Sequence, residues 1–383
     1  MTRLGDVADF INGGSWSDKE YTDTGIIVVK VTNLKNGTVD LNEVNYIPES
    51  SLDKYGRHLL RKGDLVIATV GSHPNLIASA AGRATIIPSI AEGALLNQNA
   101  LCIRTNSDDL HQGYLGYLGK SELFQGYVKS VGRGAANQVR IALGLIKEFS
   151  FQLPPLPTQR KIATILSAYD DLIENNLKRI KLLEEKAFVT YKGIVSSEKF
   201  SLKAFSDVAD YINGYPFKPV DWKLDGLPII KIRELKAGIQ NDTPRNDGEN
   251  IPEKYLIENK DILFAWSASI GAYLWYSGKS ILNQHIFNVK PFDKELHNWL
   301  YFSLLEKIPD FMNLSNGATM QHIKKSALNM VYLPGPDKRI YKEFQKETNP
   351  ILNLIINLHQ QNTKLREARD ILLPRLMNGQ IEV

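Results

Sequence analysis

The chain has 383 residues, of which 43% are apolar and 23% charged, a profile typical of a folded globular protein and not of a disordered one. This length is too great for one ordinary hydrophobic core and predicts two or more domains. A single cysteine, Cys102, excludes a disulfide scaffold and a cysteine zinc site. No apolar run is long enough to span a membrane. The net charge of +4 names no partner by itself, and with no signal-like start we expect a cytoplasmic protein.

The two halves of the chain carry the same charge and repeat the same motifs. Residues 1–200 and residues 201–383 each contain 23 Lys+Arg and 21 Asp+Glu. The segment DVADFINGG at 6–14 returns as DVADYINGY at 207–215, identical at seven of nine positions. Further matches follow in the same order along both halves, so we interpret the chain as a tandem duplication of one module.

The first module, residues 1–157, is predicted to be an α+β domain. Short runs rich in Val and Ile and bounded by Gly, Asn, Asp or Pro favour strands. They are GIIVVKV (25–31), DLVIATV (64–70), RATIIP (83–88) and ALCIRT (100–105). A helical stretch covers 113–130. Three prolines between 154 and 157 end the module, because proline stops strands and helices.

Residues 158–200 are predicted to form one long helix with an apolar stripe. The first glycine of this segment is Gly193, and no proline follows until Pro216. The residues of the stripe are spaced by three and four: Leu166, Tyr169, Ile173, Asn176, Ile180 and Leu183. Such spacing predicts the seam of a coiled coil.

The second module, residues 201–335, repeats the pattern of the first. Its predicted strands are LPIIKI (227–232), DILFAW (261–266), AYLWYS (272–277) and IFNVKP (286–291), and its helical stretch covers 297–314. Residues 336–383 again predict a helix, whose seam consists of Ile351, Ile355, Leu358, Asn362, Leu365 and Leu372. Pro350 and Pro374 predict a kink or break in this helix.

Each seam contains one asparagine, Asn176 or Asn362, among apolar residues. A single Asn in a coiled coil fixes the register at a cost in stability. We therefore predict that the two helices pair as an antiparallel coiled coil between modules in pseudo-twofold tandem. The alternative is that each helix packs only on its own module. About 35 helical residues span roughly 50 Å, the length of on the order of 15 base pairs of duplex.

Motifs for catalysis are missing. Gly119-Lys120-Ser121 and Gly278-Lys279-Ser280 have only the second half of a phosphate-binding loop, without the required upstream glycine. The seven histidines are scattered, and we interpret His285 and His322 as polar contacts or surface residues. We predict no catalytic residue and no bound metal.

Three groups of residues, none of them diagnostic alone, form a strong signal through their order along the chain. They are PPLPTQRKIATILSAYDDLIENN (154–176), LLPRLMNGQI (372–381) and the paired DVADxING openings. Over its full length the chain resembles the specificity subunit of Type I restriction–modification systems. The second junction, LPGPDKRIYKEF (333–344), departs from the Pro-Leu-Pro-x-Gln form of the first.

This resemblance implies a fold of class α+β. Two α/β target-recognition domains, 1–157 and 201–335, would alternate with conserved helical regions, 158–200 and 336–383, that form the antiparallel coiled coil. Each domain would read one half of a bipartite, asymmetric DNA site, and the coiled coil would set the spacer and dock two methyltransferase subunits that modify adenine N6. S-adenosylmethionine would bind those subunits, and ATP and Mg would bind restriction subunits where present. The chain itself would bind no cofactor and catalyse nothing.

Polar loops at equivalent places in the two modules are the candidates for DNA contacts, because Arg, Lys, Asn and Gln read base edges and Ser and Lys bind phosphates. The alignment sets Gly134–Gln138 beside Gly317–Gln321. The candidates are Ser72, His73, Asn75, Arg133, Asn137, Gln138 and Arg140 in the first module, and Lys218, Ser267, Ser269, Gln321, His322, Lys324 and Lys325 in the second. A plain glycine-rich turn is the alternative for the aligned pair, and packing is the alternative for the aromatic residues of the opening loops.

An adaptor with two protein-binding arms and no role on DNA is the alternative function. Phosphate contacts make DNA binding fall steeply with salt, so the salt dependence of duplex binding distinguishes the two functions.

Overall fold

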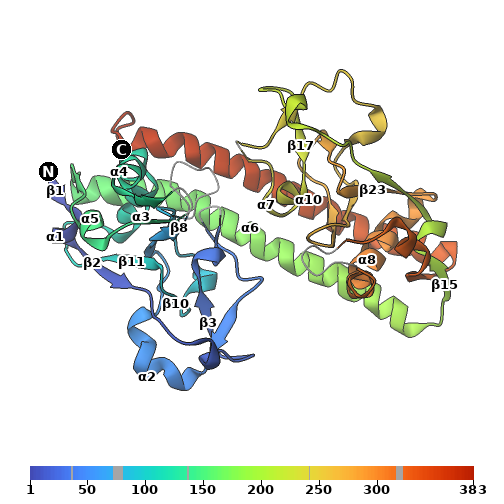
Figure 1. Ribbon diagram of the computed structural model, residues 1–383, viewed down its shortest axis with the longest axis horizontal. Coiled ribbons are helices and arrows are strands. Elements are labelled where there is room, and N and C mark those ends of the chain that lie inside the picture. The colour runs from blue at the N-terminus through green and yellow to red at the C-terminus, as the bar shows by residue number, and fades with distance from the viewer. Residues whose placement is uncertain (36–37, 72–80, 136–137, 241, 316–321) are drawn as a thin grey trace. The chain divides into compact units, whose positions relative to one another are not determined.

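The computed structural model describes residues 1–35, 38–71, 81–135, 138–240, 242–315 and 322–383. They fall into two compact units: unit 1 contains Met1–Glu174 and Leu365–Val383, and unit 2 contains Asn175–Lys364. Two long helices, α6 (Leu156–Ser197) and α10 (Lys338–Met377), each supply one part to unit 1 and another part to unit 2 (Figure 1). Each unit combines small sheets with helices, in agreement with the predicted α+β class.

The core sheet of unit 1 has four antiparallel strands. In order of pairing they are β2 (Ala8–Asn12), β11 (Ala100–Thr105), β7 (Leu65–Ala68) and β9 (Ala84–Ile86). A second sheet joins β10 (Leu95–Leu96), β3 (Ile26–Val29) and β6 (Asn45–Ile47), and in it β3 and β10 run parallel. The four strands predicted for the first module are confirmed, because β3, β7, β9 and β11 lie within them.

Unit 2 repeats this strand order. Its core sheet consists of β16 (Ala209–Asn213), β23 (Ile286–Pro291), β20 (Ile262–Ala265) and β21 (Gly271–Leu274). Its second sheet consists of β18 (Arg245–Asn246), β17 (Leu227–Ile230), β22 (Ser280–Leu282) and β19 (Leu256–Ile257), and β17 and β22 run parallel, as β3 and β10 do. The duplication predicted from the sequence is therefore confirmed by the topology.

Both repeated openings contain Asn-Gly because the backbone there approaches another strand closely. A Cβ atom on Gly13 would overlap the carbonyl oxygen of Asn97, and a Cβ atom on Gly214 would overlap that of Asn283. Only glycine allows this approach. The same contact in both units explains why the motif is retained in both copies.

The remaining elements are short. The helices are α1 (Leu4–Val7), α2 (Leu52–Tyr55), α3 (Gln112–Lys120), α4 (Glu122–Val131) and α5 (Leu143–Lys147) in unit 1, and α7 (Ile232–Ala237), α8 (His297–Glu306) and α9 (Ile308–Asn313) in unit 2. The small sheets pair β1 (Thr2–Arg3) with β14 (Ser150–Phe151), β4 (Leu34–Lys35) with β5 (Thr38–Val39), β13 (Gln138–Arg140) with both β12 (Arg133–Ala135) and β8 (Val70–Gly71), and β15 (Ser201–Ala204) with β24 (Tyr332–Gly335). Each predicted helical stretch is divided into two helices, α3 and α4 or α8 and α9.

The long helices belong to the hydrophobic core of each unit. In unit 1, Leu166 of α6 and Leu376 of α10 are buried in the same cluster as the side chains of α3. In unit 2, Tyr191 of α6 contacts both Trp299 of α8 and Phe344 of α10 through its ring. Each helix therefore packs on the modules and on the other helix, so the alternative in which each packs only on its own module is wrong.

Of the kink or break expected at Pro350 and Pro374, the break is wrong, because α10 continues through both prolines, and the kink stays a prediction. A proline inside a helix removes one backbone hydrogen bond and costs roughly 3 kcal/mol. Next to Pro350, the Asn298 side-chain amide of α8 donates to Thr348 Oγ1 and to Asn349 Oδ1, both at 2.9 Å. Pro374 lies three residues before the end of the helix at Met377.

Candidate nucleic-acid interface

In unit 2, the turn between β20 and β21 lies beside His322. Ser267 pairs with His322 as a single antiparallel bridge, and the amide of Ser269 donates to the carbonyl of Ser267 at 2.6 Å. Ala268 between them has a φ of 58°, which turns the chain sharply. Three candidates that are far apart in the sequence are thus brought together by the fold.

Trp266, at the start of this turn, was missed by the sequence reasoning. Its ring centroid lies 5.4 Å from that of His285 and 6.1 Å from that of His322, and its Nε1 donates to Asn213 Oδ1 at 3.1 Å. All three rings are half-buried. His285 and His322 therefore belong to one aromatic group at the edge of the sheet, which we call the ring group. The signal available in the sequence was the aromatic residue that follows the strand DILFA.

Lys236 is a second residue that the sequence reasoning missed. Its exposed ammonium donates to Ser269 Oγ at 3.0 Å, so a positive charge stands next to the ring group. Lys236 is held there by the short helix α7, which begins at a capping box formed by Lys231 and Glu234. The repeated Lys of VTNLKNG and IRELKAG was the available signal.

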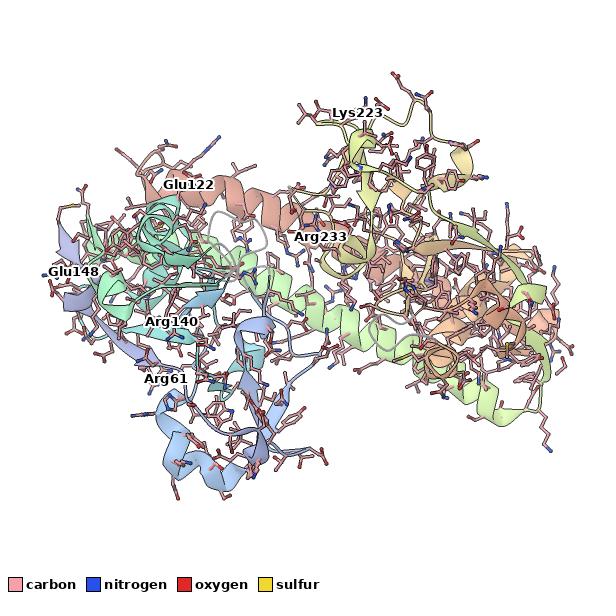
Figure 2. The ribbon with its side chains drawn as sticks, viewed as in Figure 1. Arg61, Glu122, Arg140, Glu148, Lys223 and Arg233 are labelled. Carbon is pink, nitrogen blue, oxygen red and sulfur yellow. The ribbon has the colours of Figure 1, made fainter. Side chains whose placement is uncertain are left out.

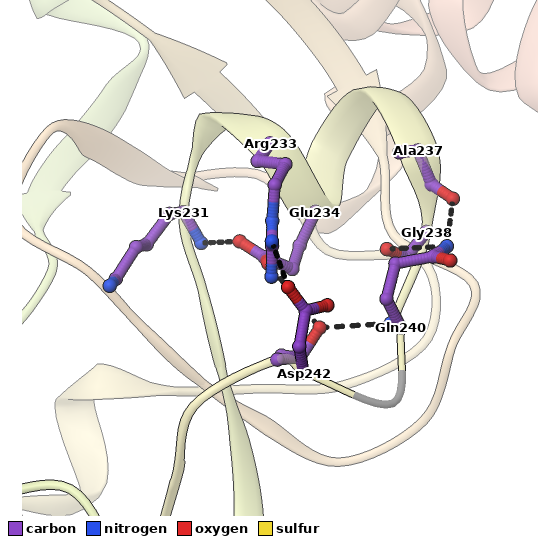
Figure 3. Close-up of polar contacts among 8 residues, drawn as sticks. Lys231, Arg233, Glu234, Ala237, Gly238, Gln240 and Asp242 are labelled. Atoms are coloured by element: carbon purple, nitrogen blue, oxygen red, sulfur yellow. Dashed lines mark hydrogen bonds and ion pairs between the residues drawn. The ribbon is translucent and has the colours of Figure 1, made fainter. Parts of the chain in front are cut away.

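The loop after α7 is tied to the helix by a charged cluster (Figure 3). Glu234 is buried and accepts from the amide of Lys231 at 3.1 Å and from Arg233 Nε at 2.8 Å. Arg233 Nη1 also donates to Asp242 at 2.6 Å, and this hydrogen bond raises the pKa of the Arg233 guanidinium. Because two carboxylates bind Arg233, its charge stabilises the loop, whereas Lys236 presents its charge to solvent.

In unit 1, the strand β13 lies at the place that corresponds to His322 in unit 2. Arg140 pairs with Val70 of β8, the strand that precedes the first candidate loop, and with Arg133 of β12. The Arg140 side chain is exposed (Figure 2), and within the described residues it makes no ion pair. Ser72, His73, Asn75, Asn137 and Gln321 lie outside the described residues, and Arg133 and Gln138 are placed by their backbone alone.

The hydrogen bonds correct the alignment of the glycine-rich segments by one residue. The amide of Ile141 donates to the carbonyl of Thr69, and the amide of Ile323 donates to the carbonyl of Trp266, both at 2.9 Å. Ile141 therefore corresponds to Ile323, and Arg140 to His322. The alignment made from the sequence set Arg140 beside Ile323, because the two segments contain similar small residues and few landmarks.

The remaining candidates lie on the surface of unit 2. Lys324 and Lys325 are exposed and follow the buried Ile323, which is the residue after His322. Lys218 is exposed at the start of a 3₁₀ turn, where its amide donates to Asp221 at 2.7 Å, and no hydrogen bond or ring contact within the described residues joins it to the ring group. In the opening loop of unit 1, the ring of Trp16 packs 5.2 Å from that of Tyr55, so this aromatic residue has a packing role.

The predicted seam residues lie on the inner sides of α6 and α10. Leu166, Ile173, Asn176, Ile180, Ile355, Leu358 and Asn362 are buried, and Tyr169, Leu183, Ile351, Leu365 and Leu372 are half-buried. In unit 2, Asn176 Nδ2 donates to Asn362 Oδ1 at 2.9 Å. In the same unit Tyr191 lies against Phe344, so α6 and α10 run antiparallel there.

In unit 1, α6 and α10 are joined by a charged network that also includes α3. Asp170 accepts from Arg369 Nη1 at 2.5 Å and from the Tyr117 hydroxyl at 2.8 Å, and Lys120 lies 4.0 Å away. Burial alone would raise the pKa of Asp170, but the charges of Lys120 and Arg369 lower it below its usual value. Arg369 interrupts the apolar spacing of the seam, and its charge is paired there with that of Asp170.

The described residues contain neither a metal centre nor a reactive thiol. They hold no group of three or more His, Cys, Asp or Glu placed to bind a metal ion. Cys102 is buried in β11, and burial raises the pKa of its thiol far above the usual range. Within the same residues, no helix combines the length and the apolar character needed to cross a membrane.

Comparison with known proteins identifies the family. The model of the type I restriction modification DNA specificity domain matches residues 1–185 and again residues 197–367. The putative type I restriction enzyme MjaX specificity subunit of Methanocaldococcus jannaschii is 22% identical over 100% of this chain and 93% of its own length. The HindI specificity subunit of Haemophilus influenzae is 30% identical over 48% of this chain and 42% of its own length.

A solved structure is similar in fold. The S subunit of a type I restriction-modification system from M. genitalium superposes with a TM-score of 0.55 at 14% identity, covering 98% of this chain and 95% of that one. Two domain matches in tandem fit the duplicated topology of units 1 and 2. The chain therefore belongs to the family of type I restriction–modification DNA specificity subunits, and its role is DNA sequence specificity and not catalysis.

Proposed function

We propose that the two modules read the two halves of a bipartite, asymmetric DNA site and that α6 and α10 set the spacer between them. The observation that carries this proposal is the pair of modules with one strand order and different polar residues at the same edge of the sheet, such as Arg140 and His322. Two copies of one scaffold with different surface residues suit two different half-sites. We assign the recognition modules to 1–157 and 201–335, and the helical regions to 158–200 and 336–383.

The proposed DNA contacts are the candidates named from the sequence together with Lys236 and Trp266. Lys218, Lys236, Lys324 and Lys325 are exposed cations suited to phosphates. Arg140 and His322 are suited to base edges, because both carry hydrogen-bonding groups on side chains long enough to reach into a groove. Ser267 is buried, so its contribution is to hold the turn that presents Ser269.

The proposed partners are subunits of a modification complex. Two methyltransferase subunits would dock on the coiled coil and methylate adenine N6 with S-adenosylmethionine, and two restriction subunits with ATP and Mg would join where they exist. The names of the relatives, which are specificity subunits of restriction enzymes, support this assembly. We place the complex in the cytoplasm, where it meets chromosomal DNA.

The test is methylation of a random duplex library by the chain in complex with its methyltransferase partner. The expected product carries methyl groups only at a bipartite motif, and exchanging residues 1–157 for the first module of another such protein changes one half-site only. Methylation at a continuous short motif would overturn the two-reader proposal. Duplex binding that does not weaken with salt would instead point to a protein adaptor.

The spacer has a separate test. Seven residues added to each long helix keep the seam in phase and lengthen it by about 10 Å, which corresponds to about three base pairs. The spacer of the methylated motif is expected to grow by that amount. An unchanged spacer would overturn the role of α6 and α10 as the ruler.

A further inference from the structure

Three positions in unit 1 and three in unit 2 are held by equivalent backbone hydrogen bonds and strand pairing, which we call the frame. In unit 1, the amide of Thr69 donates to the carbonyl of Asn99 at 2.8 Å, and Arg140 lies opposite Val70. In unit 2, the amide of Trp266 donates to the carbonyl of His285 at 3.4 Å. The pairing of Ser267 with His322 matches that of Val70 with Arg140. The equivalent positions are therefore 69 and 266, 99 and 285, and 140 and 322.

The residues around these positions are retained between the two units. Ala68 and Ala265 precede the first position, and Ile141 and Ile323 follow the third. All four of these neighbours are buried, which explains why small or β-branched apolar residues recur there. Asn-Gln precedes the second position in both units and forms the bridge to the repeated opening.

The side chains at the three positions differ completely between the units. Unit 1 carries Thr69, Asn99 and Arg140, of which Asn99 and Arg140 are exposed. Unit 2 carries the ring group of Trp266, His285 and His322, all half-buried. The backbone hydrogen bonds at the first and third positions are the same in both units, so they require neither set of side chains there, whereas at the second position Asn99 has a φ of 69°, which favours Asn.

We propose that these three positions, the specificity triplet, determine which bases each module reads; this rests on the proposed function. In unit 1, Arg140 reads a guanine edge, since a free guanidinium can bind O6 and N7 together, and Asn99 is suited to adenine. In unit 2, the rings make apolar contact with the methyl group of thymine in the major groove. Lys236, bonded to Ser269 next to the rings, takes the adjoining phosphate.

The first experiment is Arg140→Ala in the complete methyltransferase complex, assayed on the random duplex library. Discrimination at one base pair of one half-site is expected to fall by about 5- to 150-fold, with the other half-site unchanged. The matched control is Lys129→Ala, which removes an exposed cation of the same unit at a place outside the triplet and is expected to change neither half-site.

The second experiment transfers the triplet of unit 2 into unit 1 as Thr69→Trp, Asn99→His and Arg140→His together. A changed base preference in one half-site is the expected result. A uniform loss of methylation on every sequence from Arg140→Ala, or an unchanged motif, overturns the triplet while the proposed function stands. A wild-type complex that reads no bipartite motif overturns the proposed function itself. Arg140→Ala gives an answer even if the triple variant does not fold, because the Arg140 side chain is exposed.

Discussion

Replacing Asn176 by leucine should destabilise unit 2, although leucine is the better residue for an apolar seam. Asn176 Nδ2 donates to Asn362 Oδ1 at 2.9 Å, and both side chains are buried. The Asn362 Nδ2 atom has no hydrogen-bond partner within the described residues. Asn176→Leu therefore leaves the whole Asn362 amide buried without a hydrogen bond.

The magnitude follows from the cost of an unsatisfied buried polar group, about 1–3 kcal/mol. For a unit of the size of Asn175–Lys364, each kcal/mol shifts the melting temperature by about 2–4 °C. The expected loss for Asn176→Leu is thus about 2–12 °C on the transition of unit 2 in differential scanning calorimetry. Asn362→Leu should cause a loss of the same order, since it leaves the buried Asn176 side chain without its hydrogen-bond acceptor.

The double variant Asn176→Leu/Asn362→Leu tests whether the unpaired buried amide causes the loss of stability. It removes both amides, including the Nδ2 atom that already lacks a partner, so its stability should equal or exceed that of the natural chain. Asn175→Leu, one residue away on the exposed side of α6, is the matched control and should change stability by less than about 0.5 kcal/mol. A double variant less stable than either single variant would refute the reasoning.

Three further predictions concern charges. Asp170→Asn removes the carboxylate that binds Arg369 and should lower the stability of unit 1, measured calorimetrically, by about 1–3 kcal/mol, less than for a fully buried pair because Asp170 is 30% exposed. A hydrogen bond from Lys338 lowers the pKa of Asp293 to about 2. The stabilisation that the Asp293 carboxylate contributes is complete above the unfolded pKa of about 3.9 and is lost as the pH falls toward 2. The melting temperature of Asp293→Asn should therefore change less with pH between 4 and 2 than that of the natural chain. Lys236→Ala should reduce the slope of DNA affinity against salt by about one and leave the sequence preference unchanged.

Each of these charge predictions has a control and a contrary outcome. Asp171→Asn breaks only the exposed pair with Lys62, so an equal loss of stability from Asp170→Asn and Asp171→Asn would show that the network around Asp170 adds nothing. A pH profile of Asp293→Asn that follows that of the natural chain between pH 4 and 2 would contradict the assignment for Asp293. A change in the methylated motif from Lys236→Ala would mean that Lys236 contacts a base and not a phosphate.

The framework of the fold was accessible from the sequence because it depends on local and repeated signals. The run DILFA predicts β20, and the repeated openings reveal two modules of one topology. The continuity of α10 was not accessible in this way. Asn298 meets the helix from α8 beside Pro350, and no local pattern predicts a contact across 50 residues.

The sequence named candidate segments for the interface, and the structure shows which of their described residues lie together. The sequence placed candidates in two segments that the pairing of Ser267 with His322 brings together, and their contact with DNA stays a prediction. It missed Trp266 and Lys236, because a lone Trp or Lys after a repeated motif has no pattern of its own. It also misaligned Arg140 by one residue, an error that only the hydrogen bond from Ile141 to Thr69 corrects.

The side chains of the triplet can change while the backbone around them stays in place, and this has a physical reason. The bonds that fix positions 69 and 266 join backbone atoms only, so their geometry does not depend on the side chain carried there. The neighbouring Ala68 and Ala265 are fully buried, so the core tolerates little change in volume at those positions. A substitution at a position of the triplet therefore alters what the module presents to DNA while the strands that present it stay in place. This is the property that a pair of duplicated modules needs if each is to acquire its own half-site without losing the common fold.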